Sequence, residues 1–188
     1  MSSQIPVLVV IAGQPIHGKT TAADKVAPLL GFQLRDVDRV RHDYVNGATQ
    51  DVKGMEEHEI MVRAYTLATQ MSEEDVDRGV SVVQVGPHSK LEFKQPLHEL
   101  VQRRPDFPLL VFHLDASPDK IEERLAARAK DPNNISPIVT MEKYVWARKN
   151  YKPWWLGASV RYILTDDGVE STVEQIVAEV KNWRSQRA

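Results

Sequence analysis

The stretch of sequence that decides the fold is Gly13-Gln-Pro-Ile-His-Gly18-Lys19-Thr20-Thr21, which fits the pattern G-x-x-x-x-G-K-[ST] at every fixed position. It directly follows Val7–Ala12, a continuous apolar run of the kind that forms a parallel strand buried on both faces. After it, Lys19–Leu30 has helical character and ends at Gly31, a favoured residue just past a helix. The sequence therefore predicts a strand, a tight loop and a helix in immediate succession.

This loop has the chemistry to bind the phosphates of a nucleotide. Its glycines let successive backbone N–H groups point at phosphate oxygens, and the following helix adds the positive end of its dipole. Lys19 is predicted to reach the β- and γ-phosphates, and the Thr20 hydroxyl to bind Mg²⁺. The predicted phosphate-binding residues are Gly13, Gln14, Pro15, Ile16, His17, Gly18, Lys19, Thr20 and Thr21. Only the backbone of His17 is required there, so we expect its side chain at the rim of the site.

Beyond the loop, strand-like apolar runs alternate with helix-like segments along the chain. The predicted strands are Val7–Ala12, Phe32–Val37, Val80–Val85, Leu109–Leu114 and Arg161–Leu164. The predicted helices are Lys19–Leu30, Asp38 toward Gly47, Met55–Arg78, Glu92–Arg103, a helix containing Glu122–Lys130, Thr140–Asn150 and Ser171–Trp183. This alternation predicts an α/β fold with a parallel five-stranded sheet, helices on both faces, and ligands at the carboxyl ends of the strands. We expect one domain over residues 1–188, with a short helical lid at roughly 129–140.

Composition narrows the class of protein. The 188 residues include no cysteine, which excludes disulfides and thiolate metal sites. A net charge of −2 and a pI near 6.3 give no overall attraction to nucleic acid or to an anionic membrane. No apolar run approaches the ~18–20 residues of a membrane span, and the N-terminus lacks the features of a signal peptide. We therefore expect a cytoplasmic monomer or homodimer, with nucleic acid a less favoured partner.

Two charged motifs outside the loop carry a resemblance to a known family. Asp38-x-x-Arg41 follows the second predicted strand, and Arg124-x-x-x-Arg128 follows the fourth. Together with the loop, they resemble motifs of the P-loop kinase family that includes polynucleotide 5′-kinases, zeta toxins, chloramphenicol phosphotransferases and gluconokinase-like enzymes. The similarity runs over most of the chain, but only these short motifs carry it. It implies a fold like that of nucleoside-monophosphate kinases and transfer of a phosphoryl group from ATP, with Mg²⁺.

The resemblance implies that Asp38 accepts the proton of the acceptor hydroxyl and that Arg41 grips the acceptor. Both roles are physically sound, because a carboxylate at a strand end can orient an alcohol and an arginine can pair with an anionic group. Asp36, two residues earlier, is a tentative magnesium-linked carboxylate. The alternative is an ordinary charged turn in which Asp38 only caps the helix.

The resemblance also implies that Arg124 and Arg128 lead into the lid. Spaced four residues apart, they share one helix face and could neutralise charge on the transferred phosphoryl group. A solvent-facing helix with Glu–Arg pairs is the alternative. Thr165–Gly168 falls where the family's loop lines the adenine, although a turn before a capped helix explains it equally well.

The third strand departs from the family's pattern, which ends in an aspartate. Here Gln84 is the expected occupant of that position, and glutamine cannot supply the negative charge that holds metal-bound water. Efficient transfer would then require Asp36 or Asp115 to compensate. His88, at the end of the same strand, is predicted to bind the acceptor, with a plain loop histidine as the alternative.

An aromatic and basic stretch, Tyr144–Trp155, is the last distinctive feature. Its side chains could stack on bases, or they could pack a lid helix onto the core, which is the reading we favour. Taken together, the sequence predicts a kinase that moves the γ-phosphoryl group of ATP to a hydroxyl or phosphate of a small molecule. The alternatives are a non-catalytic nucleotide-binding module or weak ATPase, and a kinase of nucleic-acid 5′ ends.

Overall fold

The structure, a computed structural model, describes residues 5–47, 54–130, 138–152, 154 and 160–187. Its centre is a sheet of five parallel strands in the order β2-β3-β1-β4-β5. The strands are β1 (Leu8–Gly13), β2 (Gln33–Asp36), β3 (Val82–Val85), β4 (Leu109–Asp115) and β5 (Val160–Leu164). The predicted five-stranded parallel sheet is confirmed, with each predicted strand present.

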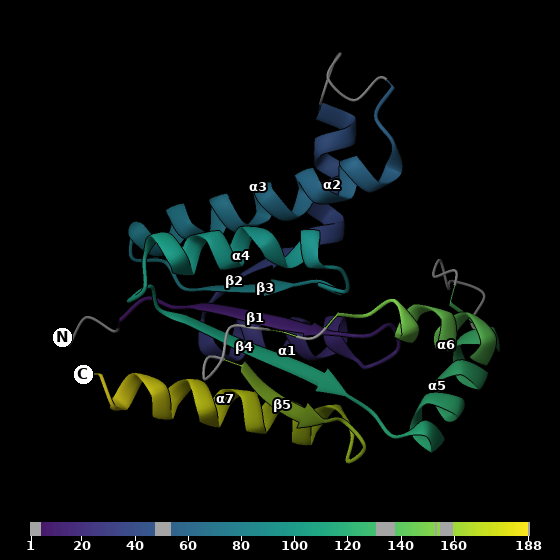
Figure 1. Ribbon diagram of the computed structural model, residues 1–188. Helices are drawn as coiled ribbons and strands as arrows, with labels where there is room; N and C mark the ends of the chain where they lie inside the picture. Colours follow the sequence, from purple (N-terminus) through teal and green to yellow (C-terminus); the bar gives the residue numbers. More distant parts are fainter. Residues whose placement is uncertain (1–4, 48–53, 131–137, 153, 155–159, 188) are drawn as a thin grey trace.

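Helices cover both faces of the sheet, as predicted (Figure 1). One face packs against α1 (Lys19–Leu30) and α7 (Val169–Ser185), and the other against α3 (Glu57–Asp77) and α4 (Leu91–Arg103). The helix α2 (Val37–Gly47) packs on α3, whereas α5 (Pro118–Lys130) and α6 (Met141–Lys149) lie beyond the carboxyl ends of the strands. Within the described part of the chain, no helix combines the length and apolar character needed to cross a membrane.

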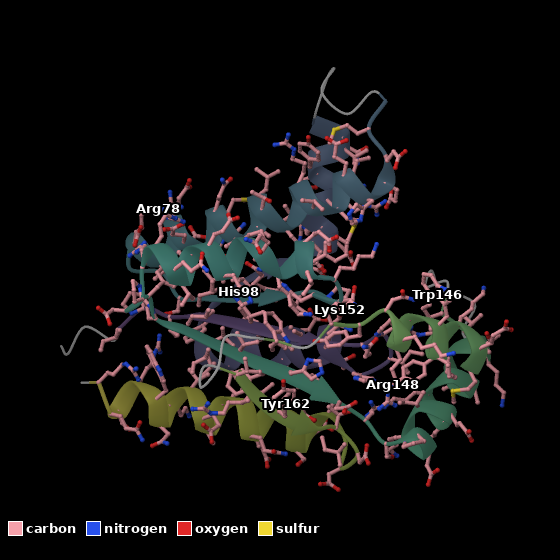
Figure 2. All side chains as sticks on the ribbon, viewed as in Figure 1. Arg78, His98, Trp146, Arg148, Lys152 and Tyr162 are labelled. Carbon is pink, nitrogen blue, oxygen red and sulfur yellow. The ribbon has the colours of Figure 1, made fainter. Side chains whose placement is uncertain are left out.

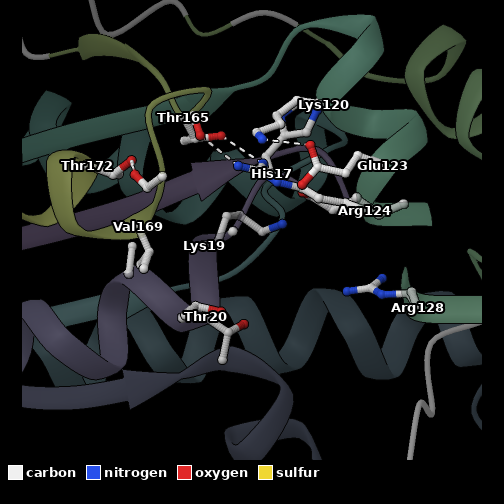
Figure 3. A pocket seen from close by; sticks show the side chains of 15 residues that line it. His17, Lys19, Thr20, Lys120, Glu123, Arg124, Arg128, Thr165, Val169 and Thr172 are labelled. Carbon is white, nitrogen blue, oxygen red and sulfur yellow. Dashed lines mark hydrogen bonds and ion pairs between the residues drawn. The ribbon is translucent and has the colours of Figure 1, made fainter. Parts of the chain in front are cut away.

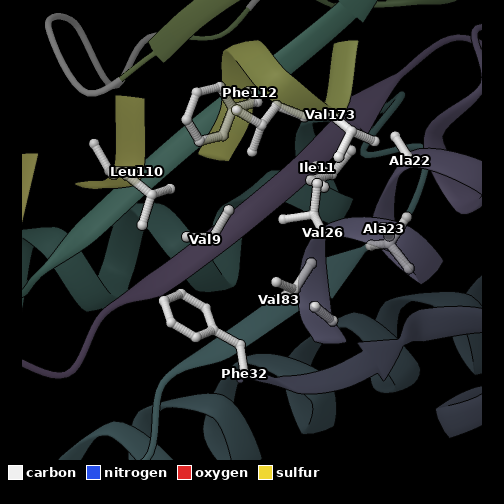
Figure 4. Packing of buried hydrophobic residues seen from close by; sticks show 14 of the residues in the cluster. Val9, Ile11, Ala22, Ala23, Val26, Phe32, Val83, Leu110, Phe112 and Val173 are labelled. Atoms are coloured by element: carbon white, nitrogen blue, oxygen red, sulfur yellow. The ribbon is translucent and has the colours of Figure 1, made fainter. Parts of the chain in front are cut away.

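The central strand β1 is buried on both faces because its residues alternate between two cores. Val9 and Ile11 belong to the cluster formed with α1 and α7, part of which Figure 4 shows. Leu8 and Val10 belong to the cluster on the α3 and α4 side. Each such buried side chain contributes about 1.5–3 kcal/mol, so the strand that carries the loop is held firmly from both sides.

A smaller cluster forms where α5 and α6 meet the loop after β1. We call it the lid cluster; its buried members are Ile16, Ala116, Ile121, Leu125 and Tyr144. The predicted lid at 129–140 lies mostly outside the described residues, which resume at Ile138. The described lid helices, α5 and α6, therefore pack on the loop itself rather than on the main sheet.

Gly13 ends β1 where no side chain fits. Its φ is 145°, and a Cβ at this position would lie 2.4 Å from the backbone oxygen of Leu114 in β4. We expect Gly13→Ala to lower the free energy of unfolding by more than about 2 kcal/mol, because backbone strain and a backbone clash add. Urea denaturation would measure this loss.

The control for this change is Gly79→Ala. Gly79 also has a positive φ, 86°, but nothing lies within 4 Å of a Cβ there. We expect it to lose only about 1 kcal/mol, the cost of the backbone conformation alone. Equal losses in the two variants would show that β4 moves aside to accept the new methyl group.

Candidate functional site

The loop after β1 leaves the first turn of α1 open. Gly18, the residue before the helix, has a φ of 77° and no side chain with which to cap it. The first turn of α1 also contains no acidic residue. The unpaired N–H groups and the positive end of the helix dipole are therefore available to an anion.

A pocket of about 470 Å³ lies in front of this open helix end (Figure 3). Its lining residues come from the loop and α1, from α5, and from the segment between β5 and α7. They are Ile16, His17, Gly18, Lys19, Thr20, Thr21, Ala22, Lys120, Glu123, Arg124, Arg128, Thr165, Gly168, Val169 and Thr172. Of the predicted phosphate-binding residues, Ile16–Thr21 line this pocket, whereas Gly13, Gln14 and Pro15 are not part of its lining.

Lys19 is the buried cation of the loop. Its Nζ donates to the backbone oxygen of Gln14 at 2.7 Å. Burial lowers the pKa of Lys19 to about 8, while the negative charge of Asp38 acts in the opposite direction. The ammonium is still mostly protonated at pH 7, and a phosphate would replace a neutral carbonyl with a charged partner.

Arg124 ties three parts of the site together. Its Nη1 donates to the backbone oxygen of Ile16 at 3.2 Å and to Oγ1 of Thr165 at 2.8 Å, and its Nη2 donates to the Thr165 carbonyl at 2.6 Å. The loop, α5 and the end of β5 are thereby fixed to one guanidinium. Arg128 lies one turn further along α5 and lines the same pocket (Figure 3).

The pocket includes residues that the sequence analysis missed. Lys120 stands four residues before Arg124 and forms an ion pair of 2.6 Å with Glu123. The signal was present, because Lys120, Arg124 and Arg128 repeat at the spacing that places side chains on one helix face. Val169 and Thr172 of α7 complete the wall near Thr165 and Gly168, the segment that the family resemblance assigned to the adenine.

At the end of β2, Asp36 caps the helix α2, and the nearby Asp38 does not. The Oδ1 atom of Asp36 accepts the backbone N–H of Asp38 at 2.8 Å, so Asp36 is the residue that caps α2. The Asp38 carboxylate is not used for capping. Its pKa is raised, first because surrounding protein partly desolvates it and then by the charge of Asp36, whereas Arg41 and Lys19 lower it. The Asp38 carboxylate is therefore more basic than usual and interacts electrostatically with Lys19.

Arg41 and His88 stay predicted acceptor contacts. Arg41 pairs with Glu57, at the start of α3, at 2.5 Å. His88 is fully buried, with a φ of 47°; its N–H donates to the Tyr65 hydroxyl at 3.1 Å, and its Nδ1 contacts the Phe93 carbonyl at 3.2 Å. The Nε2 atom of His88 has no hydrogen-bond partner among the described residues, and burial lowers the pKa of the ring to about 3.

Gln84 lies within β3, one residue before the strand ends at Val85. It pairs with Val10, three residues before the loop begins at Gly13. Its buried side chain faces α3, where Oε1 accepts the Ser72 hydroxyl at 3.0 Å. Gln84 therefore contributes to the packing of α3 on the sheet, and its place relative to a metal stays a prediction.

The expectation for the His17 side chain is wrong. Its ring is not at the rim but fully buried, where it contacts β4 and the hydroxyl of Tyr144. Of the aromatic and basic stretch that begins at Tyr144, the described aromatic side chains other than Trp146 pack inward, whereas most of the other described residues are exposed. Tyr151 contacts His113 and Trp154 is buried, whereas Trp146 projects from α6 into solvent (Figure 2).

The described residues fit a nucleoside triphosphate with Mg²⁺. The uncapped first turn of α1 and Lys19 suit the phosphates, and the exposed Thr20 hydroxyl suits the metal. No group of three or more His, Asp or Glu side chains within the described residues is arranged as a metal cage. Mg²⁺ needs no such cage, because it is commonly held by one or two protein oxygens together with substrate phosphates and water.

Comparison with known proteins supports the fold. No protein-family model matches the sequence, and no curated protein sequence matches it. Similar solved structures include a sugar kinase from Janibacter sp. HTCC2649, with TM-score 0.64, 18% identity and coverage of 95% of this chain and 94% of that one. A gluconokinase from Sinorhizobium meliloti 1021 has TM-score 0.63, 14% identity and coverages of 97% and 96%. An APS kinase from Mycobacterium tuberculosis, solved with AMPPNP and APS, has TM-score 0.62, 13% identity and coverages of 95% and 99%. The chain therefore has the fold of the P-loop kinases.

Proposed function

We propose that the protein is an ATP-dependent phosphotransferase that moves the γ-phosphoryl group to a hydroxyl or phosphate of a small molecule. The observation that carries this proposal is the placement of Asp38. Its carboxylate does not cap α2, because Asp36 does so. It interacts electrostatically with Lys19, the buried cation of the loop. A base beside the transferred group is what separates a kinase from a simple nucleotide binder.

In this function, each charged residue has a defined task. Lys19 and the N–H groups of the loop bind the donor phosphates, and Thr20 holds Mg²⁺, which offsets their negative charge. Asp38 orients the acceptor hydroxyl and takes its proton as the new P–O bond forms, while the bond from the γ-phosphorus to the bridging oxygen of ATP breaks and ADP leaves. Arg124 and Arg128 stabilise the charge on the transferred group from the lid side. The fold of the sugar kinase, gluconokinase and APS kinase neighbours is consistent with this chemistry.

One observation favours a second candidate, a nucleotide-binding module or weak ATPase. The end of β3 reads Val85-Gly86-Pro87 and offers no carboxylate to the metal. A kinase of nucleic-acid ends is less favoured, because Tyr144, Tyr151 and Trp154 are used in packing rather than held out for bases.

The test is ADP release from Mg·ATP across a panel of nucleosides, nucleotides, sugars, aminoglycosides and short oligonucleotides. Lys19→Ala serves as the blank, and we expect it to lower acceptor-stimulated release by at least about a hundredfold, since it removes the buried cation on the phosphates. Isothermal calorimetry with ATP would follow binding in both proteins.

The outcomes separate the candidates. Release stimulated by one acceptor class and absent in the blank would support the kinase and name its substrate class. ATP binding without stimulation by any class would favour the nucleotide-binding module. Equal binding and turnover in the parent and Lys19→Ala proteins would contradict the phosphate-loop assignment itself.

A further inference from the structure

His17 uses both ring nitrogens inside the protein. Its Nδ1 lies 2.8 Å from the backbone oxygen of Leu114 in β4, and its Nε2 lies 3.0 Å from the hydroxyl of Tyr144 in α6. A carbonyl can only accept, so the Nδ1 atom carries the proton and donates it to Leu114. The Nε2 lone pair is then left to accept the Tyr144 O–H. The loop is thus connected to a strand of the sheet and to a lid helix by a single ring.

The surroundings of the ring keep it in this state. Burial lowers the pKa of His17 to about 4, and the positive charges of Lys19 and Arg124 act in the same direction. Asp115, whose Oδ1 lies 3.6 Å from Nδ1, acts against them. The ring is therefore neutral at pH 7, and Nε2 remains an acceptor for Tyr144.

The preceding residue connects to the lid through packing. Ile16 has a φ of 75°, a left-handed conformation that is costly for a β-branched residue. Its side chain is nevertheless buried in the lid cluster with Tyr144 and with Ile121 and Leu125 of α5. Burial of this side chain offsets the strain, and a glycine, which would relax the backbone, could not make these contacts.

The backbone of the same two residues lies at the pocket. Ile16 and His17 both line it, and the Ile16 oxygen accepts Nη1 of Arg124. Their side chains hold α5 and α6 while their main chain belongs to the phosphate loop. The lid helices are therefore fixed with respect to the phosphates through residues 16 and 17.

We propose that Ile16 and His17 are positioning residues, which hold the lid helices in register with the phosphate loop through the lid cluster and the Tyr144–His17 hydrogen bond. The part of this inference that concerns catalysis rests on the proposed function. By fixing α5, the two residues would determine where Arg124 and Arg128 stand relative to the γ-phosphate.

The experiment removes one hydroxyl from α6. Tyr144→Phe deletes the hydrogen bond to His17, together with a side-chain hydrogen bond to Arg148, and leaves the ring in the lid cluster. Tyr151→Phe is the matched control, because Tyr151 makes a similar 3.0 Å bond to His113, away from the loop. The chain has no native cysteine, so spin labels can be placed on Leu29→Cys in α1 and Trp146→Cys in α6, both exposed. Pulsed electron paramagnetic resonance then measures the separation of α1 and α6.

We expect one narrow distance distribution in the parent and in Tyr151→Phe, and a broadened one in Tyr144→Phe. His17→Phe should broaden it at least as much, because this change removes the bond to Tyr144 and also the bond to the Leu114 carbonyl. A parent-like distribution in Tyr144→Phe would overturn the proposal. A parent-like distribution in His17→Phe would also overturn it.

Turnover provides a second, separate readout. If the protein is a kinase, Tyr144→Phe should lower kcat about fivefold, the equivalent of one neutral hydrogen bond, with KM for ATP unchanged. If Tyr144→Phe broadens the distance distribution but leaves kcat unchanged, the positioning of α5 and α6 does not affect catalysis, and that part of the proposal is refuted. Because the distance measurement needs no turnover, it tests the positioning role even where the proposed function fails.

Discussion

Asp38→Asn is expected to lose most phosphoryl transfer while it still binds ATP. The change keeps the shape of the side chain and removes its ability to take a proton, and general bases contribute about 10²–10⁴-fold to such rates. The helix α2 should be unaffected, because Asp36 provides its cap. We expect kcat for ADP release to fall by about this factor, with the Kd for ATP changed less than about threefold.

The assay is best run at pH 7. The charge of Asp38 raises the pKa of Lys19, so its removal leaves the ammonium easier to deprotonate in more alkaline buffer. Asp43→Asn is the control, since Asp43 is an exposed carboxylate on the same helix. A parent-like kcat in Asp38→Asn would exclude Asp38 as the base. A loss of ATP affinity equal to the loss of kcat would assign it to the organisation of the loop instead.

Acidification is expected to unfold the protein well above the pH at which its carboxylates titrate. Four buried histidines within the described residues have pKa values lowered by desolvation, to about 4 for His17, His98 and His113 and to about 3 for His88. In the unfolded chain the same rings bind protons near their ordinary pKa of about 6.5. Below that pH the unfolded state therefore binds more protons than the native state, so stability falls as the pH falls.

The four histidines together should remove about 7 kcal/mol of stability between pH 7 and pH 5. That is comparable with the whole stability of many domains, which is about 5–15 kcal/mol. Urea denaturation at intervals of half a pH unit would give the slope. His88→Gln should reduce this slope by about a quarter, and His42→Gln, on an exposed ring of α2, should not. A flat profile, or protonation of these rings in the native state by NMR, would contradict the prediction.

The order of elements and the position of the loop between β1 and α1 could be predicted from the sequence, because both are local patterns. Apolar runs define strands, and the spacing of glycines, lysine and threonine defines the loop. The bounds of α1 were predicted to the residue, since Gly18 and Gly31 both adopt left-handed conformations at its ends. The role of Asp36 as the cap of α2 was harder to predict. Asp36 and Asp38 lie in one turn and are both good capping residues, so only the folded backbone shows which of them caps the helix.

What the sequence could not predict depends on long-range packing. His17 was expected at the rim because the loop motif constrains backbone alone; its true environment is made by Leu114 and Tyr144, 97 and 127 residues away. The partner of Gln84 could not be predicted either, because its Oε1 accepts the hydroxyl of Ser72 in α3, a contact that forms only when the helix packs on the sheet. Lys94 would ordinarily be read as a surface residue, yet it is fully buried against the rings of Tyr151 and Trp154.

The strand order also affects how the acceptor side of such a protein could change in evolution. Because β1 divides the sheet, one contiguous block of chain, from β2 through α4, builds the side that carries Asp38 and Arg41. A second contiguous block, from β4 onward, builds the pocket wall opposite. Recombination could therefore exchange the first block as a unit. Such an exchange would change the residues proposed to bind the acceptor and leave the loop after β1 and the helix α5 unchanged. The contacts that such an exchange would have to preserve include those of Lys152 with Ser89 and Lys94, and the hydrogen bond from Arg184 to Ser81, because they join the two blocks.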